Sequence, residues 1–180
     1  MSDRFVVLSG CSGGGKSSLL AELARREHSV VEEPGRRIVR KEMASGGTAL
    51  PWVDAEAFVR RAIALALEDR RRADTMPGWV FFDRGLFDAI SALTDMTGEP
   101  ALHELGLKHR YHPTVFLAPP WPEIYETDPE RKHGLEQAEA EYSRLVRDYR
   151  LLDYSVLEVP KVPVDERADW MLARLPPSPK

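Results

Sequence analysis

Short apolar runs alternate along the chain with longer segments in which apolar residues recur at helical spacing. Five of the short runs are apolar or nearly so, which is typical of strands that are buried on both faces of a sheet. These predicted strands cover residues 5–8, 30–31, 79–82, 114–117 and 155–160.

The segments between these runs predict helices. Leu19, Leu20 and Leu23 recur at helical spacing, and Asp54 stands where a helix N-cap is expected. The predicted helices cover about 16–27, 36–42, 54–73, 86–95, 99–110, 135–152 and 164–175. Because strands and helices alternate, we predict a three-layer α/β/α fold with a five-stranded parallel sheet and helices on both faces. We expect residues 1–180 to form one domain, since no repeat or linker divides them.

A glycine-rich loop connects the first predicted strand to the first predicted helix. Residues 10–17 match the pattern G-x-x-x-x-G-K-[ST] at every fixed position. Backbone N–H groups can surround a polyphosphate only where no Cβ atom is in the way, and the helix that follows points its positive end at the same phosphates. We therefore predict a nucleotide-binding site, the fold being that of the P-loop NTPases. It comprises Gly10, Cys11, Ser12, Gly13, Gly14, Gly15, Lys16, Ser17 and Ser18.

Two side chains of this loop carry specific roles in the pattern. Lys16 is expected to reach the β- and γ-phosphates, and the Ser17 hydroxyl to hold Mg²⁺. ATP and Mg²⁺ are therefore the predicted cofactors. The alternative is an ordinary glycine-rich turn, but the strand before the loop, the Lys-Ser pair and the helix after it together favour the nucleotide site.

A carboxylate stands at the end of the third predicted strand. Trp79–Phe82 is apolar and leads directly into Asp83 and Arg84. A strand-tip Asp beside a phosphate loop is the group that supports Mg²⁺ in nucleotide triphosphatases, so we predict Ser17 and Asp83 as the metal ligands. The alternative is that Asp83 caps the next helix.

A second carboxylate follows the second predicted strand, in the sequence Glu33-Pro34-Gly35. Pro and Gly end the strand, so Glu33 is left at its carboxyl edge. In open α/β sheets this edge faces the ligand crevice. The basic residues Arg36 and Arg37 come directly after it.

The segment of about residues 121–134 is polar and interrupted by proline, and it has the composition of a lid. Arg131 could close over the phosphates during transfer and supply positive charge there. An ordinary charged loop explains the same composition.

Composition excludes some partners. The net charge of −4 and the pI of about 5.8 argue against a general nucleic-acid binder. No apolar run approaches the roughly 20 residues that span a bilayer, and the single cysteine, Cys11, rules out an intramolecular disulfide. We expect a cytoplasmic protein with no membrane or nucleic-acid partner.

These motifs resemble those of the P-loop kinases of small metabolites and nucleotides. The Glu33-Pro34-Gly35 sequence looks like a signature of thymidylate and deoxynucleoside kinases, and Asp83-Arg84 looks like their strand-end acid-Arg pair. In those families these groups handle the acceptor and its phosphate, which implies such roles here. No Asn-Lys-x-Asp guanine signature is found, so a regulatory GTPase is not expected.

A second resemblance covers nearly the whole chain. It is to small bacterial AAA-like P-loop ATPases, which are related to the nicotinamide-riboside kinase domain. The residues that carry it, beyond the loop, are Pro119, Pro120, Trp121, Tyr125, Thr127–Arg131, Val159, Pro160, Val164, Glu166 and Arg167.

The function predicted from these observations is transfer of the γ-phosphoryl group of Mg·ATP to a small hydroxyl- or phosphate-bearing acceptor, such as a metabolite, nucleoside or nucleotide. Lys16 would neutralise the phosphates, and Glu33 or Asp83 would orient or deprotonate the acceptor hydroxyl. Arg84, with Arg36 or Arg37, would bind the acceptor or the migrating phosphoryl group.

Two other functions use the same loop, namely hydrolysis of the nucleotide and a nucleotide-dependent switch that acts through a protein partner. The space between Glu33, Arg84 and the helix from Asp54 should separate them. A concave polar pocket favours a kinase, a solvent-open face favours hydrolysis, and an exposed apolar patch favours a partner. The choice between ATP and GTP, the acceptor and the oligomeric state stay open.

Overall fold

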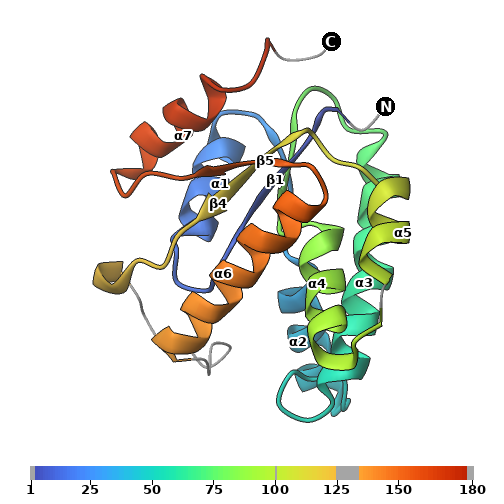
Figure 1. The fold of residues 1–180 in the computed structure, drawn as a ribbon. Helices are drawn as coiled ribbons and strands as arrows, with labels where there is room; N and C mark the ends of the chain where they lie inside the picture. Colours follow the sequence, from blue (N-terminus) through green and yellow to red (C-terminus); the bar gives the residue numbers. More distant parts are fainter. Residues whose placement is uncertain (1–2, 100, 125–133, 178–180) are drawn as a thin grey trace.

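A parallel five-stranded sheet forms the centre of the computed structural model, which describes residues 3–99, 101–124 and 134–177 (Figure 1). Its strand order is β2-β3-β1-β4-β5, and every neighbouring pair is parallel. The predicted sheet is confirmed. The strands are β1 (Phe5–Gly10), β2 (Ser29–Val31), β3 (Val80–Asp83), β4 (Thr114–Ala118) and β5 (Ser155–Glu158).

Helices cover both faces of the sheet, so the predicted three-layer α/β/α fold is also confirmed. Successive side chains of a strand point to opposite faces. Accordingly Val6 packs in a core with α1 and α7, and Val7 packs in a second core with α3, α4 and α6. Figure 1 shows α1 beside α7, with α3, α4 and α5 grouped on the other side. The helices are α1 (Lys16–Arg25), α2 (Pro34–Ser45), α3 (Ala55–Ala73), α4 (Leu86–Thr97), α5 (Ala101–Lys108), α6 (Leu135–Leu151) and α7 (Val164–Leu172), with a 3-10 turn at Pro122–Ile124.

The helix α2 is longer than the sequence pattern predicts. It begins at Pro34 instead of residue 36 and ends at Ser45 instead of residue 42. Proline ends a strand, but its fixed φ also suits the first turn of a helix, so Pro34 does both. Gly46 then ends the helix with a φ of 68°. The predicted N-cap of α3 is confirmed, since the Ala57 N–H donates to the Asp54 carboxylate at 3.0 Å.

The sheet order brings the carboxyl ends of β1, β3 and β4 together at one edge. Gly10 ends β1 with a φ of 116°, and a Cβ atom there would overlap the carbonyl oxygen of Ala118 on β4. Only glycine allows the chain to turn into the loop this close to the neighbouring strand. The loop is therefore held against the middle of the sheet. Among the described helices, none is both long and apolar enough to cross a membrane.

Candidate active site

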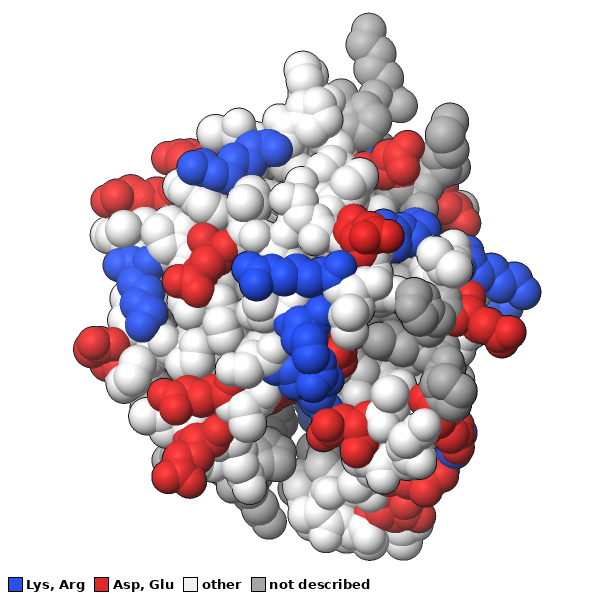
Figure 2. All heavy atoms as spheres, in the orientation of Figure 1, with Lys and Arg blue, Asp and Glu red and all other residues white. Residues whose placement is uncertain are grey.

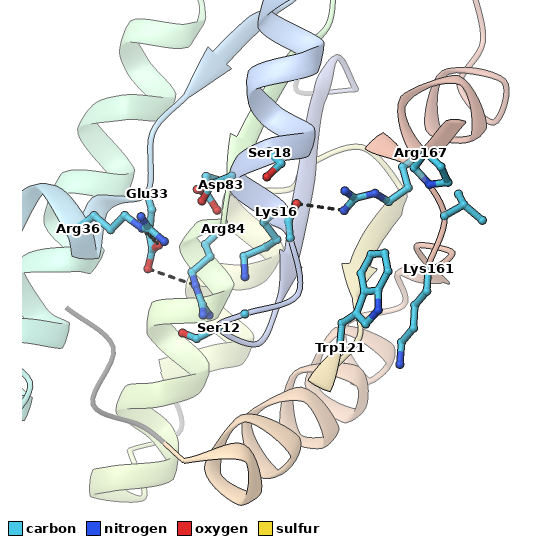
Figure 3. Close-up of a pocket in the computed structure, with 15 residues that line it drawn as sticks. Ser12, Lys16, Ser18, Glu33, Arg36, Asp83, Arg84, Trp121, Lys161 and Arg167 are labelled. Atoms are coloured by element: carbon cyan, nitrogen blue, oxygen red, sulfur yellow. Dashed lines mark hydrogen bonds and ion pairs between the residues drawn. The ribbon is translucent and has the colours of Figure 1, made fainter. Parts of the chain in front are cut away.

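A cavity of about 610 Å³ lies at this edge of the sheet. It is lined by six residues of the glycine-rich loop and the start of α1, by residues after β2 and β3, and by residues near β4 and α7 (Figure 3). The lining residues are Ser12, Gly13, Gly15, Lys16, Ser17, Ser18, Glu33, Arg36, Asp83, Arg84, Trp121, Lys161, Val162, Pro163 and Arg167.

The loop presents its backbone to the cavity. Gly13 and Gly15 have φ angles of 80° and 74°, which favour glycine. Gly15 is also the N-cap of α1 and supplies no side-chain hydrogen bond to it. The first N–H groups of α1 thus have no capping side chain, and the positive end of the helix faces the cavity. This backbone arrangement suits a polyphosphate.

Three loop residues of the predicted nucleotide site do not line the cavity. Gly10 and Gly14 pack against the end of β4, where a Cβ atom on either would meet backbone atoms of residues 118–119. Cys11 is fully buried, and burial raises the pKa of its thiol. These residues shape the loop, while the cavity is lined by Ser12, Gly13 and the residues from Gly15 to Ser18.

The ammonium group of Lys16 lies over the loop. Its Nζ donates to the carbonyl oxygen of Cys11 at 2.5 Å and to that of Gly10 at 3.3 Å. Lys16 is only 8% exposed, and burial, followed by the nearby charge of Arg84, lowers its pKa. The group is held at the mouth of the loop, where phosphate oxygens would meet it.

Asp83, at the end of β3, has a buried oxygen without a partner. Its Oδ1 has no hydrogen bond to any described residue. Burial first, and the charge of Glu33 second, raise the pKa of this carboxyl to about 6. The alternative capping role does not apply, because the N–H of Gly85 at the start of α4 donates to Asp88 instead, at 2.8 Å. A buried unpaired carboxylate oxygen beside a phosphate loop fits a cation.

Arg84 connects the two motifs predicted to bind the acceptor, Glu33-Pro34-Gly35 and Asp83-Arg84, because its side chain contacts Glu33. Its backbone has a φ of 63°, which is uncommon for a residue with a side chain. Its Nε lies 3.3 Å from Oε1 of Glu33, and Oε2 of Glu33 accepts from Nε of Arg36 at 3.2 Å (Figure 3). Arg37 is not part of this group. It pairs with buried Asp69 on α3 at 2.7 Å, so of the two candidate arginines only Arg36 reaches the cavity.

Glu141 on α6 belongs to the same cluster, and sequence reasoning missed it. Nη1 of Arg84 donates to Oε1 of Glu141 at 2.8 Å and lies 3.6 Å from Oδ1 of Asp88. Burial alone would raise the pKa of Glu141, but the Arg84 guanidinium outweighs burial and lowers it. Glu141 stands 57 positions from Arg84 in a helix rich in charged residues, so nothing in its neighbours distinguishes it. Only the packing of α6 does.

The opposite half of the cavity has a different character. Figure 3 shows Trp121, Lys161 and Arg167 on the side of Lys16 away from Glu33 and Arg84. The Arg167 guanidinium lies 5.3 Å from the centre of the Trp121 ring and donates to the Gly15 carbonyl at 3.1 Å. A flat aromatic group, a cation and the apolar side chains of Val162 and Pro163 offer a surface for a planar ring.

The sequence predicted that the helix from Asp54 and a lid of about residues 121–134 surround the site. None of the described residues that line the cavity comes from α3 or α6, so the expectation that the helix from Asp54 borders the acceptor space is wrong. Glu141 of α6 reaches the site through its contact with Arg84. Most of the predicted lid, including Arg131, lies outside the described residues. From that segment, Trp121 lines the cavity.

Comparisons with known proteins agree with this fold. A family model described as an AAA domain matches residues 5–167. A search of curated proteins finds no match. Among solved structures, deoxyadenosine kinase from M. mycoides is similar with a TM-score of 0.62 and 14% identity, over 94% of this chain and 97% of that one.

Two further structures are similar. Shikimate kinase from Acinetobacter baumannii, in complex with shikimate, has a TM-score of 0.58 and 18% identity, over 94% of this chain and 90% of that one. The NadR protein in complex with NR has a TM-score of 0.67 and 18% identity, and the chain covers 49% of that protein's length. At these identities the likeness shows the fold alone, which this chain shares with these three proteins.

Proposed function

This chain belongs to the AAA domain family, and we propose that it is an enzyme that transfers the γ-phosphoryl group of ATP to a small-molecule acceptor. The observation that carries the proposal is the composition of one cavity. A phosphate-type loop faces it from one side, and a carboxylate-arginine cluster faces it from the other. It is the concave polar pocket that favours a kinase over a hydrolase or a partner-binding switch.

ATP would occupy the half of the cavity that contains the loop and Trp121. The backbone of the loop and Lys16 suit the phosphates, and the Trp121–Arg167 pair suits the base. In support of this, Trp121 and Arg167 lie together on the side of Lys16 away from Glu33 and Arg84 (Figure 3). This arrangement leaves the half with Glu33 and Arg84 for the acceptor.

The residues present fit a magnesium ion. Ser17 is exposed at the start of α1 and lines the cavity, and Asp83 has its buried unpaired oxygen. Among the described residues no group of three His, Cys, Asp or Glu side chains could hold a metal, but Mg²⁺ commonly takes one or two protein ligands together with phosphates and water. When bound, the ion neutralises charge on the phosphoryl group during transfer. Ser17 and Asp83 would hold it.

Glu33 is the better candidate for the group that orients or deprotonates the acceptor hydroxyl. Asp83 is buried and is assigned to the metal, whereas Glu33 is half-buried and lines the cavity between two arginines. Arg84 and Arg36 would fix the direction of the Glu33 carboxylate. In phosphoryl transfer, such positioning and charge compensation supply most of the catalysis.

One face of the protein carries side chains of both charge signs. Figure 2 shows acidic and basic side chains interspersed over one face, with a basic group near the centre that acidic side chains border. Nucleic-acid binding depends on a continuous basic surface, which this face does not present.

The test is an assay of purified protein with Mg·ATP, alone and with a deproteinised metabolite extract. We expect ADP and a phosphorylated product only when the extract is present. Equal ADP formation without extract would make water the acceptor and the protein a hydrolase. Protection of the protein by ATP against unfolding, without turnover under either condition, would favour the switch.

A further inference from the structure

More negative than positive side chains surround Arg84. Four carboxylates surround Arg84 and its neighbours, namely Glu33, Asp83, Asp88 and Glu141, and three cations face them, namely Lys16, Arg36 and Arg84. Lys16 is directed at the nucleotide phosphates by the loop. Of these groups, Glu33, Asp83, Arg36 and Arg84 line the cavity, whereas Asp88 and Glu141 contact Arg84 without lining it.

Both arginines are already engaged by carboxylates of the chain. An arginine recognises a phosphate or carboxylate through N–H groups that it can offer in pairs. In Arg84, Nη1 donates to Glu141, and Nε lies 3.3 Å from Glu33 but makes no hydrogen bond to a described residue. Nε of Arg36 donates to Glu33 as well. A phosphate that binds Nη1 of Arg84 would have to displace Glu141 and then lie beside its negative charge.

The three partners of Arg84 are not equivalent. Asp88 accepts hydrogen bonds from Ser9, Tyr149 and the Gly85 N–H, so it is fixed by the fold. Glu33 is assigned to the acceptor hydroxyl and is shared with Arg36. Glu141 makes the shortest contact with Arg84, and its side chain is 28% exposed. It is the partner whose charge can be removed with the least disturbance of the fold.

From this arrangement we infer that Glu141 determines acceptor specificity. By occupying Arg84, it excludes acceptors that carry a phosphate or carboxylate and restricts the reaction to hydroxyl groups on uncharged or cationic molecules. The inference rests on the proposed function and narrows the acceptor to this chemical class. If Glu141 has this role, the protein is a kinase of unphosphorylated hydroxyl compounds and not a kinase of nucleotides. The phosphate loop alone does not distinguish these two kinds of kinase. An enzyme can gain specificity by repelling the wrong acceptor as well as by attracting the right one.

The first experiment needs no variant and no knowledge of the acceptor. A deproteinised extract is passed over an anion-exchange resin at pH 8, and both fractions are assayed with the wild-type protein and γ-labelled Mg·ATP for a labelled product other than inorganic phosphate. We expect the product with the unretained, uncharged or cationic fraction. A product formed only with the retained anionic fraction would overturn the inference and leave the proposed transferase function intact.

The second experiment measures the selectivity of Glu141 directly. Binding of inorganic phosphate is followed by calorimetry on protein whose nucleotide site is saturated with a non-hydrolysable Mg·ATP analogue. Glu141→Gln should bind phosphate at least about tenfold more tightly than the wild type, because removal of the carboxylate frees Nη1 of Arg84 and removes a repulsive charge. Glu139→Gln makes the same charge change at an exposed position of the same helix and should leave phosphate binding as in the wild type.

The two experiments distinguish the two ways of being wrong. If neither fraction yields a product, the transferase proposal fails, and phosphate binding alone judges Glu141. If Glu141→Gln, with a melting temperature close to that of the wild type, binds phosphate no better than the wild type, Glu141 does not control anion access. The same conclusion follows if Glu139→Gln gains phosphate binding equally, since the effect would then be one of overall charge.

Discussion

The two halves of the cavity are built in different ways. The nucleotide half consists largely of consecutive residues, and its chemistry lies in the backbone of Gly13 to Ser18 and the start of α1. The acceptor half consists of side chains from the ends of β2 and β3 and the start of α2, and Glu141 of α6 contacts one of them, Arg84. The first half therefore suits the phosphates that the proposed function assigns to it. The second half is where this chain can differ from its relatives, since single side chains decide its charge.

The largest effect should come from Lys16→Ala. This change removes the charge that faces the nucleotide phosphates, and we expect turnover to fall by roughly 10³-fold, as for loss of a central electrostatic group. The measurement is ADP formation together with protection against unfolding by ATP. Lys41→Ala, at an exposed position of α2, is the matched control. Turnover close to that of the wild type in Lys16→Ala would remove the basis for the nucleotide half.

Asp83→Asn tests the boundary between the two halves. Without the carboxylate, the metal loses a ligand, and turnover should fall by about 100-fold while nucleotide affinity changes much less. The readouts are the Mg²⁺ dependence of turnover and the Kd of ATP. Equal losses in binding and turnover would place Asp83 in nucleotide binding instead.

The same variant should be more stable than the wild type without nucleotide. The pKa of Asp83 is raised from 3.8 to about 6 by burial and by Glu33, so the folded state holds the proton more tightly than the unfolded state does. The stability that the Asp83 proton gives to the folded state is fully present below about pH 4 and is lost as the pH rises through 6. At pH 8 we expect Asp83→Asn to raise the free energy of unfolding by about 3 kcal/mol. Denaturant unfolding at pH 4 and pH 8 measures the difference, which should nearly vanish at pH 4.

Arg84→Gln should affect the acceptor half alone. It removes the cation that orients Glu33, and we expect acceptor-dependent transfer to fall by about 30-fold, the scale of one charged hydrogen-bonding group. The Kd of ATP should stay within about threefold. Arg71→Gln, at an exposed position of α3, is the control. A change in ATP affinity as large as the change in transfer would mean that the two halves are not separate.

The smallest effect should come from Trp121→Ala. Loss of the ring removes a stacking surface beside Arg167, and the KM for ATP should rise about fivefold with little change in kcat. Trp121→Phe keeps an aromatic face and should restore most of the affinity. If the KM for ATP is unchanged in Trp121→Ala, the base lies elsewhere.

The fold was accessible from the sequence because its signals are local. The strands β1, β3 and β4 are short, almost wholly buried runs, whereas the edge strands β2 and β5 are more exposed. Helices such as α3 and α6 follow the 3.6-residue period over many turns. The errors lie at the ends of elements, as in α2, where Pro34 both ends the strand and begins the helix. Asp54 as the cap of α3 was also predictable, since capping depends on the residues of one turn.

The site could be predicted from the sequence only in part. Glu33, Asp83 and Arg84 stand at strand ends, and a parallel sheet brings such ends to one edge, so their proximity could be expected. That Arg36 and not Arg37 reaches the cavity depends on the direction in which α2 leaves the sheet. Asp88, and not Asp83, caps α4, because Arg84, with its positive φ, and Gly85 separate Asp83 from the start of the helix.

By itself, the sequence determined the phosphate loop and the layered fold, because both depend on neighbouring residues. Glycines permit the backbone angles of the loop, and periodic apolar residues select strand or helix. The tertiary structure alone decided which carboxylates meet Arg84. Contacts of 2.8–3.6 Å between residues 33, 84, 88 and 141 require the strand order of the sheet and the packing of α6 beside it. No local pattern encodes that packing, because it depends on the shape of the whole core.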